Sequence, residues 1–204
     1  MPLQEHFKVD MKKILANPQS VIKGKNYRIT VLSPLLIRFE YSTTGEFEDR
    51  PTELVSNRNF PVVNYEKKED TKYLTNKTEY YTVTYQKEQP FMGSKVSPDQ
   101  YLRVELNDTD KYWYMNHPEV RNFGGTTYML DGADGKAKFG KGLYSTDGFT
   151  SIDDSNSLIY NQDGSLGKRN DKRIDIYVFM YKRDFGAALR DYFTLTGFPA
   201  LVPR

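Results

Sequence analysis

Apolar and polar residues alternate along Tyr27–Leu32, so that every second side chain would face the same side of an extended segment. Alternation with a period of two predicts a β-strand with one buried face. The pattern stops at Ser33-Pro34 and resumes over Leu35–Tyr41. Because proline cannot donate a hydrogen bond to a neighbouring strand, these two segments are expected to be strands joined by a turn.

Further short alternating segments follow at a spacing typical of all-β proteins. Thr71–Thr75 and Glu79–Tyr85 flank Asn76-Lys77, which the pattern predicts as a tight hairpin turn. Tyr101–Leu106 and Lys111–Tyr114 add two more β-prone segments. Short strands separated by turn residues predict an all-β fold, an antiparallel β-sandwich.

A helical pattern is convincing only near the end of the chain, over residues 185–195. Asp184 is placed to cap its first turn, and Gly197 stands where a helix C-cap belongs. The helical spacing collects one apolar stripe of four residues, Phe185, Leu189, Tyr192 and Phe193. We therefore expect a sandwich domain over residues 1–183 and a connector segment with one helix over 184–204.

Composition supports a folded β domain. The chain has 204 residues, enough for one domain with a substantial core. Aromatic residues make up 14%, including 16 Tyr, which favours a packed pleated fold over disorder. The 29 basic and 27 acidic residues are spread along the chain and leave a formal charge of +2, so neither a nucleic-acid partner nor a membrane partner is predicted.

The sequence carries no cysteine, which excludes disulfides and thiolate metal sites. It has no apolar run approaching the ~20 residues that span a bilayer. Its first residues also lack the basic and apolar segments of a secretory signal. These features predict a cytoplasmic protein, unless a signal has been removed, and no cofactor.

The segment Asn122–Lys136 differs from its surroundings because it holds four Gly and two Asp within fifteen residues. It is expected to form a long exposed loop, in which glycine allows a ligand to approach the backbone closely. Asp131 and Asp134 could accept hydrogen bonds from sugar hydroxyls. Alternatively, their Asp-Gly pairs form two turns in which each aspartate bonds only to its own backbone.

Other polar residues are interpreted structurally. Adjacent strand residues point to opposite faces, so Asp153 and Asp154 are expected to diverge and to serve in a turn. His117 has no second histidine nearby, and no metal site is predicted. Trp113 is interpreted as a core residue rather than a sugar platform. The basic pairs at 67–68, 168–169 and 172–173 are expected to be solvated.

Several dispersed segments, in the right order, resemble one family. They are Tyr27–Leu32, Phe47–Thr52, Lys141–Ser155, Asp175–Tyr181 and Leu195–Pro199. Together they resemble the N-terminal, galactose mutarotase-like β-sandwich of family 31 of the glycoside hydrolases, the α-glucosidase and α-xylosidase family. The resemblance implies that the chain is incomplete, that a catalytic (β/α)8 barrel follows as its partner, and that both catalytic aspartates lie beyond Arg204. No catalytic residue is then expected in this chain.

The resemblance also implies a role for the glycine-rich segment. In family 31 the sandwich sends a loop across the mouth of the barrel, and by order along the chain this loop corresponds to residues 126–142. Asp131 and Asp134 become the candidate substrate-binding residues, with an oligosaccharide as substrate. Asn122–Thr126 stands where many relatives have a Gly-Leu-Gly-Glu type run, so the role of that Glu cannot be carried over.

The resemblance thus predicts a non-catalytic domain of a retaining α-glycosidase that acts on terminal α-linked glucosyl-type residues. One alternative is a stand-alone carbohydrate-binding module that holds sugars on Tyr and Trp platforms. A second is a mutarotase-like epimerase. The epimerase needs a converging His and acidic pair, and this chain has only His6 and His117.

Overall fold

A computed structural model describes residues 11, 14–92, 100–125, 134, 139–169 and 172–198. The described chain forms two five-stranded antiparallel sheets, one helix and a small two-stranded ribbon. The helix-side sheet has the order β1-β2-β3-β12-β9, with bounds Val21–Lys23, Tyr27–Val31, Leu36–Tyr41, Ile174–Met180 and Phe149–Asp153. The outer sheet has the order β4-β5-β6-β7-β8, with bounds Glu66–Glu69, Tyr73–Lys77, Tyr81–Gln86, Leu102–Leu106 and Tyr112–Tyr114. The remaining elements are a 3-10 turn at Pro18–Ser20, the ribbon β10 (Ile159–Tyr160) and β11 (Leu166–Gly167), and the helix α1 (Phe185–Thr196).

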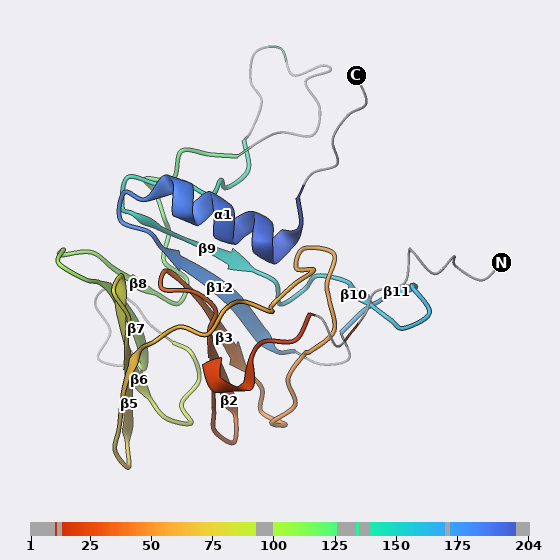
Figure 1. Ribbon diagram of the computed structural model, residues 1–204, viewed down its shortest axis with the longest axis horizontal. Coiled ribbons are helices and arrows are strands. Elements are labelled where there is room, and N and C mark those ends of the chain that lie inside the picture. Colours follow the sequence, from red (N-terminus) through yellow and green to blue (C-terminus); the bar gives the residue numbers. More distant parts are fainter. Residues whose placement is uncertain are drawn as a thin grey trace.

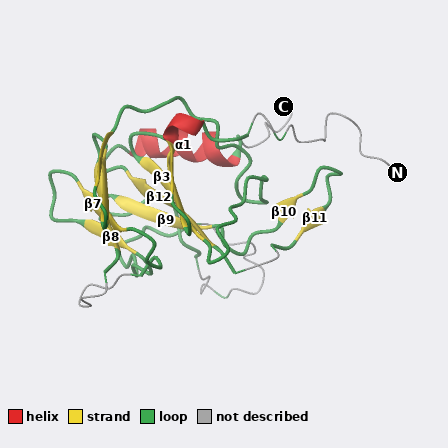
Figure 2. Cartoon of the chain, turned by 90° about the horizontal axis from the view of Figure 1, so that it is seen from below, coloured by secondary structure: helices red, strands yellow, loops and turns green. Residues whose placement is uncertain are grey.

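The two sheets pack face to face, and α1 lies on the opposite face of the helix-side sheet (Figure 1, Figure 2). Strand β12 shows how the sequence produces this layering. Ile176 and Val178 point into the core between the sheets, whereas Tyr177 and Phe179 point to the helix. Both faces of this interior strand are therefore apolar over residues 176–179, as expected for a strand covered on both sides.

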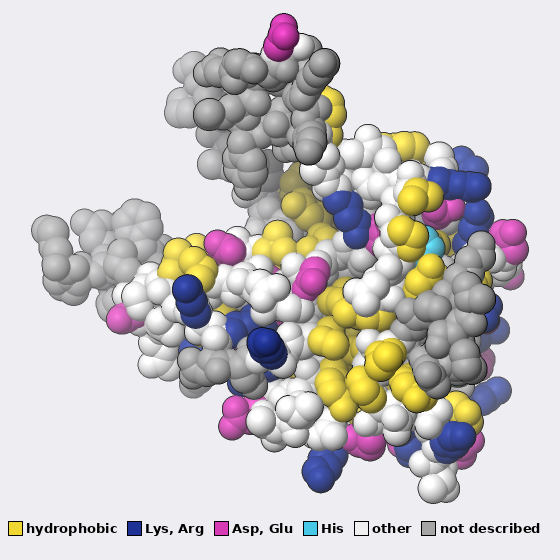
Figure 3. All heavy atoms as spheres, turned by 180° about the vertical axis from the view of Figure 1, so that it is seen from behind, with side chains coloured by type: hydrophobic (Ala, Val, Ile, Leu, Met, Phe, Trp, Pro, Cys, Tyr) yellow, Lys and Arg dark blue, Asp and Glu magenta, His cyan; other side chains and the backbone are white. Residues whose placement is uncertain are grey.

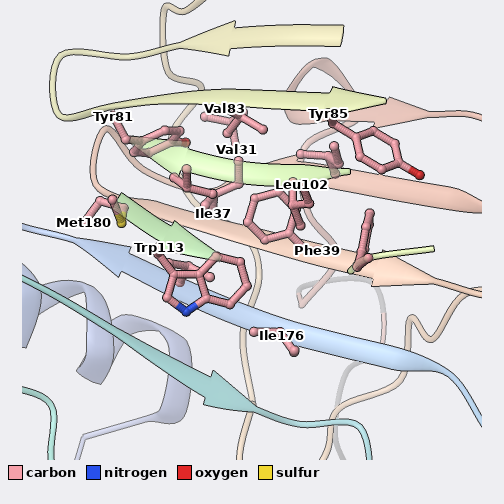
Figure 4. Packing of buried hydrophobic residues seen from close by; sticks show 14 of the residues in the cluster. Val31, Ile37, Phe39, Tyr81, Val83, Tyr85, Leu102, Trp113, Ile176 and Met180 are labelled. Carbon is pink, nitrogen blue, oxygen red and sulfur yellow. The ribbon is translucent and has the colours of Figure 1, made fainter. Parts of the chain in front are cut away.

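The core between the sheets is built from the alternating residues of both layers (Figure 4). Trp113 of β8 is only 1% exposed, and its ring is stacked on Phe39 of β3 at 5.9 Å. The core interpretation of Trp113 is therefore confirmed. The predicted fold class is confirmed as well, because the described residues form an antiparallel β-sandwich with a single α-helix.

The predicted hairpin turn at Asn76-Lys77 is wrong. Strand β5 continues through both residues and pairs with β6, and Asn76 is fully buried. The chain turns instead at Thr78, whose hydroxyl oxygen accepts hydrogen bonds from the backbone N–H groups of Tyr80 and Tyr81. Threonine, like asparagine, can form such a turn through its side chain. The turn lies at Thr78 because Asn76 is buried in the strand.

Both predicted caps of the helix are confirmed. The Asp184 carboxylate accepts a hydrogen bond from the Ala187 N–H at 2.9 Å, and Gly197 ends the helix with a positive φ of 95°. The predicted apolar stripe is confirmed in part, because Phe185 and Tyr192 pack on the sheet, but the fully buried helix residues are Ala188 and Leu195. Leu189, predicted to lie on the stripe, remains 38% exposed.

A cluster of buried ion pairs lies on the face of the helix-side sheet that also carries α1. Residues 48–58 cover this cluster. Arg38 donates two hydrogen bonds of 2.8 Å to Asp175. Arg169 donates to both Asp175 and Asp154, at 3.0 and 3.1 Å. Thr52 donates to Asp154 at 2.9 Å. The expectation that the 168–169 pair is solvated is therefore wrong for Arg169, whose side chain is 5% exposed.

The two carboxylates of this cluster have opposite pKa shifts. Burial, and then the negative charge of Asp175, raises the pKa of Asp154 above its usual range. Burial acts in the same direction on Asp175, but the charge and hydrogen bonds of Arg38 outweigh it and hold the pKa of Asp175 well below its usual range. Asp175 is thus the fixed anion of the cluster, and Asp154 is the carboxylate whose charge is less well compensated.

Candidate functional site

The stem of the glycine-rich loop is a firmly bonded part of the sandwich. The side chain of Asn122 donates to the Gly142 carbonyl oxygen at 2.8 Å and accepts from the N–H groups of Gly142 and Gly124 at 2.8 and 2.9 Å. Farther along, the Gly125 N–H donates to the Gly140 carbonyl oxygen at 2.6 Å. One amide side chain therefore joins the two arms at the base of the loop.

Glycine is required in this stem because the two arms approach each other with no room for a side chain. A Cβ atom built on Gly142 would lie 2.0 Å from the Gly124 carbonyl oxygen. One built on Gly125 would lie 2.9 Å from the Lys141 carbonyl oxygen. The sequence predicts that glycines in this segment let a ligand approach the backbone. At Gly125 and Gly142 the group that approaches the backbone is the opposite arm of the loop.

Glu119 joins this stem to β9, the edge strand of the helix-side sheet. Its carboxylate accepts hydrogen bonds from the Thr150 hydroxyl at 2.8 Å, the Ser151 N–H at 3.0 Å and the Ser151 hydroxyl at 2.5 Å. Lys141 lies 2.7 Å from the same carboxylate and also donates to the Ser151 hydroxyl. Glu119 has no signal in the sequence, since nothing in the spacing of Met115–Glu119 marks a side chain that bonds to Thr150 and Ser151 on a distant strand.

A pocket of about 660 Å³ lies between the loop stem, β9 and α1. Its wall combines apolar side chains with hydrogen-bonding groups, and the lining residues are Leu54, Gly124, Gly125, Lys141, Gly142, Leu143, Tyr144, Ser151, Ile152, Asp153, Leu189 and Tyr192. A concave site with apolar walls and a few polar groups is the usual form of a binding site. The groups left to bind a ligand are the Asp153 carboxylate and the ring of Tyr192, because the Ser151 N–H and hydroxyl both donate to Glu119, which also pairs with the Lys141 ammonium group.

Large apolar side chains around this pocket are exposed. Phe123 and Phe139 belong to the stem, and Phe123 packs against Phe185 of α1 with the ring centroids 6.5 Å apart. Leu189 and Phe198 are exposed on the helix and just after it. Exposed apolar side chains grouped in this way mark an interaction surface.

The two predicted substrate-binding residues lie in the part of the loop beyond this stem. Asp131 and residues 126–133 and 135–138 lie outside the described residues. Asp134 is exposed and forms a turn with a positive φ of 43°. The prediction that Asp131 and Asp134 contact a sugar therefore stays a prediction.

The structure separates Asp153 from Asp154, as expected from their positions on a strand. Asp153 is exposed and accepts a hydrogen bond from the Ser155 N–H, which is the predicted turn role. Asp154 also begins the predicted turn, because its carbonyl oxygen accepts the Ser157 N–H at 3.2 Å, but its side chain is in addition fully buried and bonded to Thr52 and Arg169. Burial and these contacts remove Asp154 from any exposed catalytic pair.

His117 lies under the loop rather than in a metal site. Its ring packs edge-on against Tyr114 and Phe149, and its Nδ1 accepts the N–H of Glu119 at 3.0 Å.

Among the described residues, no group of three or more His, Asp or Glu side chains could hold a metal ion. Likewise, no helix in the described ranges is long and apolar enough to cross a membrane. Basic and acidic side chains are interspersed over the rear face of the molecule (Figure 3).

The fold was compared with solved structures. A GH31 dextranase of Flavobacterium johnsoniae, in a mutant form complexed with isomaltotriose, matches 88% of this chain at 15% identity and a TM-score of 0.43. The same dextranase complexed with glucose matches 87% of the chain at 15% identity and a TM-score of 0.42. The matches cover 27% and 26% of the dextranase chains, so this chain spans about a quarter of their length. No protein-family model and no curated protein sequence matches the chain.

Proposed function

We propose that this chain is the non-catalytic N-terminal sandwich of a retaining α-glycosidase of the family 31 type, and that it lends a loop to the substrate pocket. The observation that carries the proposal is the placement of the segments that resemble the family. Tyr27–Leu32, Lys141–Ser155 and Asp175–Tyr181 run through β2, β9 and β12 of one sheet. Phe47–Thr52 and Leu195–Pro199 are the other two segments, and Leu195 packs on the helix side of that sheet.

The loop stem supports the second half of the proposal. A loop that contributes to a pocket formed with another domain needs a firm base on its own domain. Asn122 and Glu119 supply that base. The exposed Phe123, Phe139 and Leu189 stand beside the stem and offer the partner barrel an apolar surface. In this proposal the substrate is an oligosaccharide with a terminal α-linked glucosyl-type residue.

This chain alone is expected not to hydrolyse aryl α-glycosides above background. Retaining glycosidases need two carboxylates about 5 Å apart, one as nucleophile and one as acid/base. Asp154 and Asp175, which share Arg169, are buried in ion pairs and cannot reach a substrate. Release of nitrophenol is the assay, and turnover that disappears in Asp153→Asn would contradict the proposal.

Asp134→Ala is expected to lower kcat/KM about ten- to a hundredfold in the longer polypeptide that joins this sandwich to a barrel. The expected loss is that of one hydrogen bond between a carboxylate and a sugar hydroxyl, about 1.5–3 kcal/mol. The stability of the fold should barely change, because Asp134 is exposed. Asp163→Ala is the matched control, since Asp163 is an exposed turn aspartate bonded to Ser165. Equal activity of both variants and the parent would restore the interpretation of Asp134 as a turn residue only.

The alternative of a carbohydrate-binding module is favoured by one observation, the 660 Å³ pocket with its Tyr192 wall and polar Ser151 and Asp153. A module of this kind should bind glycans without any further domain. Titration of this chain with maltose and isomaltose oligosaccharides, followed by calorimetry, separates the two proposals. Binding that Tyr192→Ala abolishes would favour the module, whereas absence of binding favours the enzyme domain.

A further inference from the structure

We propose that Glu119 and Lys141 form a latch that positions the glycine-rich loop for substrate binding. This inference rests on the proposed function, because the loop is taken to enter the substrate pocket. Neither residue is assigned to contact the sugar. Their role is to fix the angle at which the loop leaves the sandwich.

Burial and backbone conformation single out Glu119. The residue is 5% exposed, and its φ of 45° lies in the left-handed region that residues other than glycine seldom adopt. A buried carboxylate is costly unless it is paired and hydrogen-bonded. Here both conditions are met, since three hydrogen-bond donors and one ammonium group surround it.

The latch is attached to β9, one of the two edge strands of the helix-side sheet. Strand β9 pairs with β12 along one side only, and the Ser151 N–H points to the open side. The Glu119 carboxylate takes the place that a carbonyl oxygen of a further strand would have. This side-chain contact occupies one of the outward N–H groups of the edge strand and attaches the loop stem to it.

Lys141 adds a second connection, between the returning arm of the loop and Glu119. It belongs to the returning arm of the loop, next to Gly142, whereas Glu119 precedes the outgoing arm. The ion pair between them therefore ties the two ends of the loop to each other and to Ser151. The Lys141 side chain is 42% exposed and lines the pocket. The ion pair that it forms with Glu119 therefore lies at the surface of the sandwich and outside its core.

The latch can be tested in this chain without any enzyme activity. Lys141→Met should leave the fold intact and speed hydrogen exchange of the Gly125, Gly142 and Ser151 amides about tenfold, because the stem opens more often. Glu119→Gln keeps the size of the side chain, removes the charge, and should give the same pattern. Lys141→Arg should restore slow exchange. The matched control is Lys87→Met, since Lys87 forms an ion pair of 2.9 Å with Glu69 far from the loop. Unchanged exchange at these amides in both Lys141→Met and Glu119→Gln would overturn the latch.

The positioning role requires a second measurement in the longer polypeptide. Lys141→Met should raise KM about three- to tenfold while kcat stays within about twofold, because a misplaced loop weakens ground-state and transition-state binding alike. Lys141→Arg should return KM to its original value. An unchanged KM in Lys141→Met, in a protein where Asp134→Ala does lower kcat/KM, would overturn the positioning role alone. If Asp134→Ala is silent as well, the proposed loop function fails, and the positioning role fails with it.

Discussion

Asp175→Asn is expected to lower the free energy of unfolding by about 3–5 kcal/mol at pH 7, the usual cost of removing one partner of a buried ion pair. Asp175 is buried, and Arg38 donates both of its 2.8 Å hydrogen bonds to this carboxylate. Without the negative charge, the guanidinium of Arg38 stays buried, and its remaining ion pair among the described residues is with Glu40 at 3.0 Å. Urea unfolding followed by tryptophan fluorescence measures the loss.

Asp154→Asn is the matched comparison and should cost less, about 1–2 kcal/mol. Burial and the charge of Asp175 raise the pKa of Asp154, so its surroundings already disfavour the negative charge that the variant removes. The neutral amide can still accept the hydrogen bond from Thr52. Equal losses in both variants would contradict the assignment of Asp175 as the fixed anion of the cluster.

The effect of Asp175→Asn should also depend on pH. The pKa of Asp175 is lower in the folded chain than in the unfolded chain, so its contribution to stability is present above the unfolded pKa of about 4. That contribution is lost as the pH falls through the range between the two pKa values. The gap in stability between the parent chain and Asp175→Asn should therefore narrow below about pH 4. A double change, Arg38→Met with Asp175→Leu, should recover part of the loss, because no unpaired charge remains.

Local pattern was sufficient to predict the sandwich because alternation records which side chains face a core. It failed on the helix side of β3, where Arg38 and Glu40 occupy the polar positions of the alternation and yet are buried. Their cover is residues 48–58, through contacts such as the bond from Arg38 to the Glu48 carbonyl oxygen. A period-two pattern cannot distinguish a solvated polar face from one that a distant segment covers and pairs with charge.

The sequence located the glycine-rich loop but not the contacts that hold its stem, and the roles of Asp131 and Asp134 stay predictions. Glycine enrichment located the loop, and the structure adds that Gly125 and Gly142 serve the close approach of the two arms. Glu119 could not be found in this way, since its partners Lys141 and Ser151 lie far along the sequence. Charged residues that act through long-range pairing leave no periodic signal.

Trp113→Ala is expected to destabilise the chain by about 3–5 kcal/mol, the range measured when a large buried aromatic side chain is truncated. Trp113 is 1% exposed, and its ring is stacked on Phe39 of the opposite sheet. In Figure 4 it lies beside side chains of the opposite sheet, Phe39, Ile176 and Met180. Truncation would leave a cavity where the two layers meet. Thermal unfolding by circular dichroism measures the shift.

Two further variants separate core packing from sugar binding at this position. Trp113→Phe should cost less than about 1.5 kcal/mol, because it keeps an aromatic ring against Phe39, and the indole N–H has no hydrogen-bond acceptor among the described residues. Tyr112→Ala should change stability little, since Tyr112 points to the other face of β8 and is only partly buried. If Trp113→Ala instead left the unfolding temperature unchanged and abolished glycan binding, the ring would be a sugar platform. The sandwich would then bind carbohydrate through β8, and packing between the two sheets would not require the Trp113 ring.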